Sequence, residues 1–180
     1  LRLLEHLNML SVWNRTEDKA DPLRAAGALV SPSLRFLCES SETVCLMLTG
    51  DEATAASVAE AMGCAAPPTL LVNFATVSPE CARDCAELCA ARGCAYVSCP
   101  VTGRPNRAAS GQLACWVSAA EAAAARTVAE ELCPALAAHV VVLSETDVSA
   151  ASTFKRAAAP HPASAPRLAL YPPPLPSHPS

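Results

Sequence analysis

The sequence predicts an α/β protein built on a doubly wound, mostly parallel sheet. Apolar, β-branched runs alternate with capped helical segments from Met9 to Ser144, as repeated β-α units require. The run Thr43–Thr49 is apolar without interruption, which is typical of a parallel strand covered on both faces. The stretch from Thr69 to Trp116 contains a complete strand-helix-strand unit. In such sheets, ligands bind in the loops that follow the strand ends.

The strand-helix-strand unit carries a signal at each boundary. Ser78 is a natural N-cap, and Pro79 suits the first helical turn because its missing N–H is not needed there. Gly93 favours the end of the helix, since glycine readily adopts the left-handed conformation that follows a last turn. These signals predict a strand, a helix and a second strand over residues 69–75, 79–92 and 94–98.

The same signals place the other elements. Before this unit we expect helices over residues 1–7, 17–26, 31–39 and 50–62, and strands over 9–13, 28–30 and 43–49. After it we expect strands over 112–118 and 139–144 and an alanine-rich helix over 119–136. A last helix begins at Asp147 or Ser149, either of which can cap it, and includes Lys155. The remainder is proline-rich and lacks periodicity, so we expect one domain over residues 1–155 and a disordered tail over 156–180.

The composition limits the classes of partner. Of the 180 residues, 52% are hydrophobic and only 4% aromatic, and alanine supplies much of the apolar content, as in helices packed closely on a sheet. The net charge of −4 disfavours nucleic acid, whose phosphates require a basic face. No apolar run reaches the roughly 18 residues of a membrane span. We therefore expect neither a nucleic-acid nor a membrane partner.

Ten cysteines raise the alternatives of metal binding, redox chemistry and reduced thiols. Cys81, Cys85 and Cys89 recur every four residues and share one helix face, while Cys45 and Cys115 lie in expected strands. No two cysteines have the CxxC spacing that structural zinc sites commonly use. We favour reduced thiols packed as small hydrophobic groups, with no metal site, and keep redox sensitivity and metal binding as weaker alternatives. Reduced thiols favour the cytoplasm, or an organelle, as the compartment.

Two segments carry a resemblance that extends over most of the chain. VNFATVSPE and ARGCAYVSCPVTGRPNRAASGQL, within a match from about Val12 to Lys155, resemble the β-hydroxyacid dehydrogenase family. That family groups 3-hydroxyisobutyrate dehydrogenase, glyoxylate/succinic semialdehyde reductases and imine reductases, and shares its NADP-binding domain with 6-phosphogluconate dehydrogenase. The resemblance implies a Rossmann-like domain of an oxidoreductase that transfers a hydride between NADP(H) and a small hydroxy acid, aldehyde or imine.

The residues after the second strand of such a fold indicate the coenzyme. An acidic residue there holds the ribose 2′-hydroxyl of NAD, whereas an arginine accommodates the 2′-phosphate of NADP. Here the segment is Asn14-Arg15-Thr16, with Lys19 close by and no acid at the strand end. We therefore predict that Asn14, Arg15, Thr16 and Lys19 bind NADP. An arginine that is merely solvated in its loop is the alternative.

The resemblance also implies which residues lie near the nicotinamide. The family places cofactor contacts just after the strand that corresponds to 43–49, which transfers the role to Met47, Leu48 and Thr49. Thr76 matches the family's nicotinamide-ribose position before the next helix. A hydroxyl that only assists helix entry is the structural alternative for Thr76.

Hydride transfer further requires a proton relay and groups that hold the substrate. The family's PVSG motif corresponds to Pro100-Val101-Thr102-Gly103, so Thr102 and Gly103 are the predicted substrate-binding residues, with Thr102 also catalytic. Lys155 falls on the family's relay lysine and is the second predicted catalytic residue. Without the resemblance, a single lysine near a helix start would be interpreted as an exposed surface group.

Departures from the family pattern favour a chain truncated at both ends. The family's first strand and glycine-rich turn would precede Leu1, and its long helical domain, through which full-length relatives form homo-oligomers, would follow Lys155. Arg156 replaces an asparagine-bearing turn, and Ser98 replaces an acid. We expect at most half of an active site here and no turnover by the chain alone. A catalytically silent relative that acts as an interaction module is the alternative, and a cysteine-based redox or metal protein is a weaker one.

Overall fold

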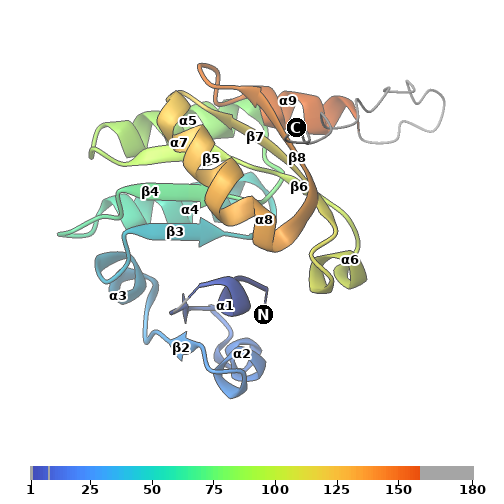
Figure 1. The fold of residues 1–180 in the computed structure, drawn as a ribbon. Helices are drawn as coiled ribbons and strands as arrows, with labels where there is room; N and C mark the ends of the chain where they lie inside the picture. Colours follow the sequence, from blue (N-terminus) through green and yellow to red (C-terminus); the bar gives the residue numbers. More distant parts are fainter. Residues whose placement is uncertain (1, 8, 159–180) are drawn as a thin grey trace, which may run out of the picture.

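The computed structural model describes residues 2–7 and 9–158 and contains a small and a large sheet (Figure 1). The small sheet pairs β1 (Ser11–Val12) with β2 (Leu29–Val30) in parallel. The large sheet has the order β3-β4-β5-β7-β6, with β8 paired to β7. Its strands are β3 (Thr43–Leu46), β4 (Leu70–Asn73), β5 (Ala95–Ser98), β6 (Val101–Thr102), β7 (Leu113–Ala119) and β8 (Ala137–Ser144).

The N-terminal helices are short. They are α1 (Arg2–His6), α2 (Asp21–Ala25) and α3 (Leu34–Glu39). The single helix expected over 17–26 is instead a 3-10 turn, Glu17–Ala20, followed by α2, because Pro22 lacks the N–H that a continuous helix needs. Ser33 caps α3 by accepting a hydrogen bond from the Phe36 amide at 3.0 Å.

The predicted strand-helix-strand unit is confirmed. The two long helices of the parallel half are α4 (Gly50–Met62) and α5 (Pro79–Ala90). Ser78 caps α5 by accepting from the Cys81 amide at 3.1 Å, and Gly93 has φ +70°, the left-handed conformation expected after this helix. Strands β3, β4 and β5 that flank these helices are parallel and in register.

Beyond β5 the sheet becomes mixed. Strand β7 runs antiparallel to both β5 and β6, and the short helix α6 (Pro105–Ala109) connects β6 to β7. Strand β8 then pairs with β7 in parallel. The helix expected over 119–136 is α7 (Ala122–Thr127), a π-helical turn (Val128–Leu132) and α8 (Cys133–Leu136).

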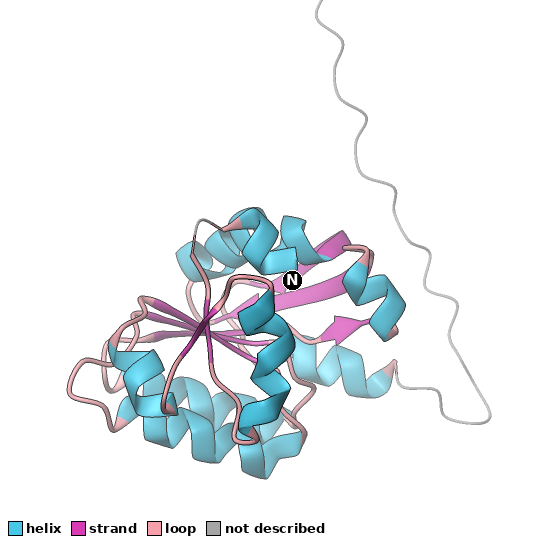
Figure 2. Ribbon diagram, turned by 90° about the horizontal axis from the view of Figure 1, so that it is seen from below, coloured by secondary structure: helices cyan, strands magenta, loops and turns pink. Residues whose placement is uncertain are grey.

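Helices cover both sides of the large sheet, which confirms the doubly wound class (Figure 2). Neighbouring strand residues point to opposite cores: Leu71 packs with α3, α4 and α5, whereas Val72 packs with α7, the π turn and α8. Tyr96 and Val97 of β5 divide in the same way. We call these the first and the second core. They fix the parallel strands between two layers of helices.

Strand β3 corrects one expectation. Its side chains alternate, with Val44 and Leu46 buried and Cys45 exposed, so the apolar run is not covered on both faces. Among the described residues β3 pairs with β4 alone, and β1 pairs with β2 alone.

The last described helix is α9 (Ala150–Ala157). It continues two residues past Lys155, so the boundary expected at 155 lies within this helix. The predicted disorder of the tail concerns residues that, from 159 onward, lie outside the described part of the chain. None of the helices in that part is both long and apolar enough to cross a membrane.

Candidate functional site

The carboxyl ends of the three parallel strands form one edge of the large sheet. In the register, Leu46 of β3 lies beside Asn73 of β4, and Asn73 lies beside Ser98 of β5. The segments that follow these strands therefore begin side by side. They contain Met47–Thr49, Thr76 and Thr102, so the structure brings these sequence-predicted residues to one edge.

Asn73 fixes the turn after β4 and was not predicted as a site residue. Its side chain is fully buried; Nδ2 donates to the Tyr96 hydroxyl at 3.0 Å, and Oδ1 accepts from the Ala75 amide at 3.0 Å. Burial raises the pKa of Tyr96, so its hydroxyl stays protonated. The following residue, Thr76, is exposed at the edge. A lone polar residue at the end of an apolar strand was the available signal.

The start of α4 is tied to the start of α5. Asp51 Oδ1 accepts from the Ser78 amide at 2.9 Å, and the hydrogen bonds from Ser78 lower the pKa of Asp51. The Thr49 side chain makes no capping bond to α4 and is exposed. The Met47 side chain is 68% exposed. Both groups are thus available to a ligand.

Lys155 and Thr102, the two predicted catalytic residues, meet although 52 residues lie between them in the sequence. Lys155 Nζ donates to the Val101 carbonyl at 2.8 Å and to Thr102 Oγ1. Trp116 Nε1 also donates to Thr102 Oγ1, at 3.1 Å. A hydroxyl that accepts two hydrogen bonds keeps its own proton free to donate. Burial lowers the pKa of the Lys155 amine, which brings its titration closer to neutrality.

Buried serines hold α9 against the sheet and so position Lys155. Ser118 Oγ donates to the Val148 carbonyl at 2.8 Å and accepts from the Ala151 amide at 3.0 Å. Ser98, which replaces the family's acid, is fully buried with its hydroxyl 3.2 Å from that of Ser152. Sequence reasoning did not identify this anchoring role.

Asp147 caps the turn that leads into α9. Its Oδ1 accepts from the Ser149 amide at 2.9 Å and from the Ser149 hydroxyl at 2.7 Å, which lowers the pKa of Asp147. Arg83 of α5 donates to the same hydroxyl at 3.2 Å. Of the two caps expected for this helix, Asp147 is therefore the one whose side chain acts, while Ser149 makes no side-chain capping bond to α9.

A hollow beside Thr102 carries positive charge. Thr102 and Gly103 line it together with Arg104 and Arg107. Gly103 has φ +150°, and a Cβ there would lie 2.5 Å from the Leu113 side chain, so this turn requires glycine. Neither arginine forms an ion pair with a described residue. The GRPNR segment was the signal for these two arginines, which sequence reasoning missed.

The Arg15 loop lies at the end of β1. The Thr16 amide donates to Asn14 Oδ1 at 2.9 Å, closing a tight turn. Arg15 and Lys19 are exposed and, within the described residues, have no carboxylate partner, whereas Arg24 pairs with Asp21 at 2.7 Å. No hydrogen bond or ion pair between described residues joins this loop to the edge that holds Thr102. The structure therefore does not bring the two predicted groups into contact.

Comparisons with known proteins agree with this geometry. Residues 1–159 match the family described as the NAD binding domain of 6-phosphogluconate dehydrogenase. The uncharacterized oxidoreductase YfjR of Bacillus subtilis is 27% identical over an alignment of 144 residues, and the match covers 78% of this chain and 50% of YfjR. A proposed oxidoreductase from Mycobacterium avium 104 has 26% identity and a TM-score of 0.78, with 87% of this chain and 55% of that one covered.

Two further solved structures have named activities. The reductive aminase from Aspergillus terreus, solved with NADPH and ethyl levulinate, is 25% identical with a TM-score of 0.71, over 87% of this chain and 53% of its own. The 3-hydroxyisobutyrate dehydrogenase of Mycobacterium tuberculosis, solved with L-serine, shares the fold at 20% identity and a TM-score of 0.76, over 86% and 53%. The chain thus spans about half the length of these relatives. It belongs to the family of the NAD binding domain of 6-phosphogluconate dehydrogenase.

Proposed function

We propose that this chain is the NADP-binding part of an oxidoreductase that transfers a hydride between NADP(H) and a small hydroxy acid, aldehyde or imine. The meeting of Lys155 with Thr102 at the carboxyl edge of the sheet carries the proposal. The Aspergillus terreus relative with bound NADPH supports the choice of coenzyme class. When bound, the nicotinamide supplies or accepts the hydride.

The coenzyme fits the described residues at two places. Arg15 and Lys19 are cations without a carboxylate partner in the described part of the chain, as a phosphate dianion would require. The exposed Met47, with the free hydroxyls of Thr49 and Thr76, offers apolar and hydrogen-bonding contact at the sheet edge. Leu48 packs against the first core below them and supports this surface. We assign the 2′-phosphate to the first place and the nicotinamide riboside to the second.

Lys155 acts as the proton relay in this proposal. Its amine has a pKa below the usual lysine value because it is partly buried, so it exchanges a proton more readily near neutral pH than an exposed lysine. Thr102 receives hydrogen bonds from Lys155 and Trp116 and can donate its own proton outward to a substrate oxygen or nitrogen. The rings of Trp116 and Phe154 pack against each other in a tilted arrangement, with centroids 4.6 Å apart, and support the position of the Trp116 side chain.

The substrate is a small molecule that carries an acid group or a polar carbonyl. Arg104 and Arg107 line the hollow beside Thr102 and Gly103, and an arginine fork suits a carboxylate. Such a contact would orient the carbonyl or imine carbon relative to the Thr102 hydroxyl. Full-length enzymes of this kind would form homo-oligomers through a separate helical domain.

The test uses a chimera in which this chain replaces the 144 residues that it matches in the Bacillus subtilis relative. The chimera is assayed for NADPH oxidation with glyoxylate, succinic semialdehyde and a cyclic imine. We expect turnover with at least one of them, and we expect Lys155→Met to lower kcat by about 10²- to 10⁴-fold without changing NADPH affinity.

Arg156→Met is the matched control, because Arg156 is the exposed neighbour of Lys155 on the same helix. Equal rates in the two variants would contradict the relay. A chimera that binds NADPH but turns over none of the three compounds would favour the silent interaction module over the enzyme.

A further inference from the structure

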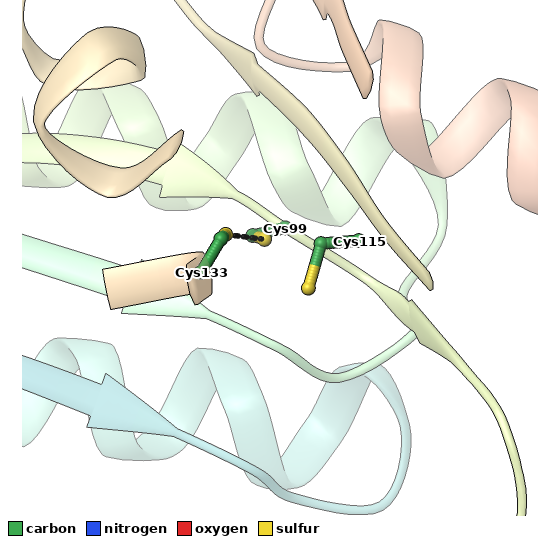
Figure 3. A group of neighbouring side chains, drawn as sticks. All are labelled: Cys99, Cys115 and Cys133. Atoms are coloured by element: carbon green, nitrogen blue, oxygen red, sulfur yellow. Dashed lines mark hydrogen bonds between the residues drawn. The ribbon is translucent and has the colours of Figure 1, made fainter. Parts of the chain in front are cut away.

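Three cysteines from distant parts of the chain meet in the second core. Cys99 follows β5, Cys115 lies in β7, and Cys133 begins α8 (Figure 3). All three are fully buried, and their sulfur atoms lie within 4.8 Å of one another. The Cys99 and Cys133 sulfurs are 3.8 Å apart. Such a cluster of three thiols is a different feature from the coenzyme edge described above.

The elements that carry the three cysteines direct their thiols toward one another. Cys99 and Cys115 belong to neighbouring parts of the large sheet and face the same core. Cys133 reaches them directly after the π-helical turn Val128–Leu132. A π turn adds one residue to a helix and thereby rotates all that follows by about 100° relative to a regular α-helix. This local irregularity, of a kind frequent at functional sites, is what directs Cys133 toward the sheet.

The spacing of the sulfurs suits three bonds to one ion. A metal–thiolate bond of about 2.3 Å, with angles between those of a pyramid and a flat trigonal arrangement, places the sulfurs about 3.3 to 4.0 Å apart. The 3.8 Å between Cys99 and Cys133 already lies in this range. The other sulfur pairs are at most 4.8 Å apart, and small rotations of the cysteine side chains would bring them into this range.

The apolar residues around the three cysteines favour an ion whose complex with three thiolates is neutral. The thiols are packed in this core with the apolar residues Val72, Phe74, Val97, Val117, Ala119, Ala124, Ala125, Val128 and Leu132. A charged complex without a partner is costly in such a medium. With three thiolates, the complex has a net charge of −2 for a monovalent ion, −1 for a divalent ion and zero for a trivalent ion. The divalent zinc ion also lacks a fourth ligand within the cluster.

We propose that Cys99, Cys115 and Cys133 form a three-thiolate site for a trivalent, thiophilic metalloid of the arsenite and antimonite class. With arsenous acid, three As–S bonds form and three As–O bonds break, and each thiol proton leaves with a hydroxide as water. No electrons are transferred, and the product is neutral. The three-coordinate pyramid leaves no open position, which matches a site that is closed to solvent.

The test titrates the purified chain, reduced with a phosphine and free of dithiols, with sodium arsenite. We expect one arsenic atom per chain, a rise in the thermal unfolding midpoint with arsenite concentration, and X-ray absorption that reports three As–S bonds and no As–O bond. Cys115→Ala should weaken binding by about tenfold or more, since it removes one of three bonds.

Cys85→Ala is the matched control, because Cys85 is a buried thiol of the first core that lies 3.9 Å from Cys81. If Cys85→Ala abolishes binding, and arsenic in the unmutated chain has two As–S bonds and one As–O bond, then arsenic binds the Cys81–Cys85 pair. That result would overturn the proposal. Absence of bound arsenic would overturn it as well, as would a disulfide between Cys99 and Cys133 that persists after treatment with the phosphine. If Cys115→Ala does not fold, three As–S bonds in both the unmutated chain and Cys85→Ala still support the proposal, and their loss in Cys85→Ala overturns it.

Discussion

At the scale of single residues, buried polar side chains determine where the predicted site residues Thr76, Thr102 and Lys155 lie. Asn73 holds the turn before Thr76 through hydrogen bonds to Tyr96 and Ala75. Ser118 holds the start of α9 and thereby places Lys155 beside Thr102. Each of these polar groups is satisfied, which is the condition for polar atoms to remain in a protein interior.

The pKa of Lys155 can be measured directly because the chain contains only two lysines, Lys19 and Lys155. We expect the resonance of ¹³C-dimethylated Lys155 to titrate with a midpoint below the ordinary value of 10.5, since burial disfavours its charged form. The unfolded chain then binds more protons than the native one just below that value, so this lysine makes stability rise with pH there. Lys19→Arg assigns the two resonances. A Lys155 midpoint at or above 10.5 would contradict the buried position.

Single residues also mark a limit of sequence reasoning. Lys155 and Thr102 were predicted from the family pattern, and the structure brings them together. Asn73 and Ser118 were not predicted as positioning residues, because one polar residue in an apolar strand looks the same whether its partner is water or a distant backbone group. That partner is set by the packing of α9 and β5, which local periodicity does not encode.

At the scale of elements, helix α9 is the one that joins the predicted catalytic residues. It packs against α5, β7 and β8, and the turn that precedes it is fixed by Asp147 and Arg83. Its anchoring thus combines buried hydroxyls on the sheet side with an exposed cap at its start. Loss of that cap should loosen the start of the helix while leaving the sheet intact.

Asp147→Ala tests this cap. We expect a loss of about 1 kcal/mol in the free energy of unfolding at neutral pH, as for other capping residues. The pKa of Asp147 is lowered in the native state, so its contribution is fully present above the ordinary value of 3.8 and is lost as the pH falls below that value. Urea unfolding of both proteins from pH 7 downward measures it. A difference that grows on acidification would contradict the assigned role.

Most elements follow from apolar runs and caps, and their exceptions have local physical causes. Ser78, Pro79 and Gly93 predicted the limits of α5 well because capping chemistry is local. Pro22 divides the second helix, which its missing N–H could have indicated. The π-helical turn Val128–Leu132 and the exposed face of β3 could not be predicted, because both depend on which elements pack beside them.

At the scale of the whole molecule, the sheet is divided into a pair of strands and a group of six. The larger group lies between two apolar cores, while Trp13 beside β1 packs against the first core from the side of the smaller sheet. A two-stranded sheet has few hydrogen bonds and is marginally stable alone. Stability should therefore differ strongly between the two sheets.

Native-state hydrogen exchange measures that difference. We expect the amides of β1 and β2, Ser11–Val12 and Leu29–Val30, to exchange much faster than those of β4, Leu70–Asn73, because local opening exposes them without unfolding the cores. Equal protection in both sheets would show instead that they unfold as one unit.

The central claim, that this chain is an NADP-binding domain of its family, is tested most directly by coenzyme titration. Binding of NADPH and NADH is compared by calorimetry in the unmutated chain, in Arg15→Ala, and in Arg24→Ala, whose arginine is paired with Asp21 and serves as the control. We expect NADPH to bind more tightly than NADH, and Arg15→Ala to weaken NADPH alone by about 1–3 kcal/mol, the worth of one charge-assisted contact. Equal losses for the two coenzymes, or a preference for NADH, would contradict the account.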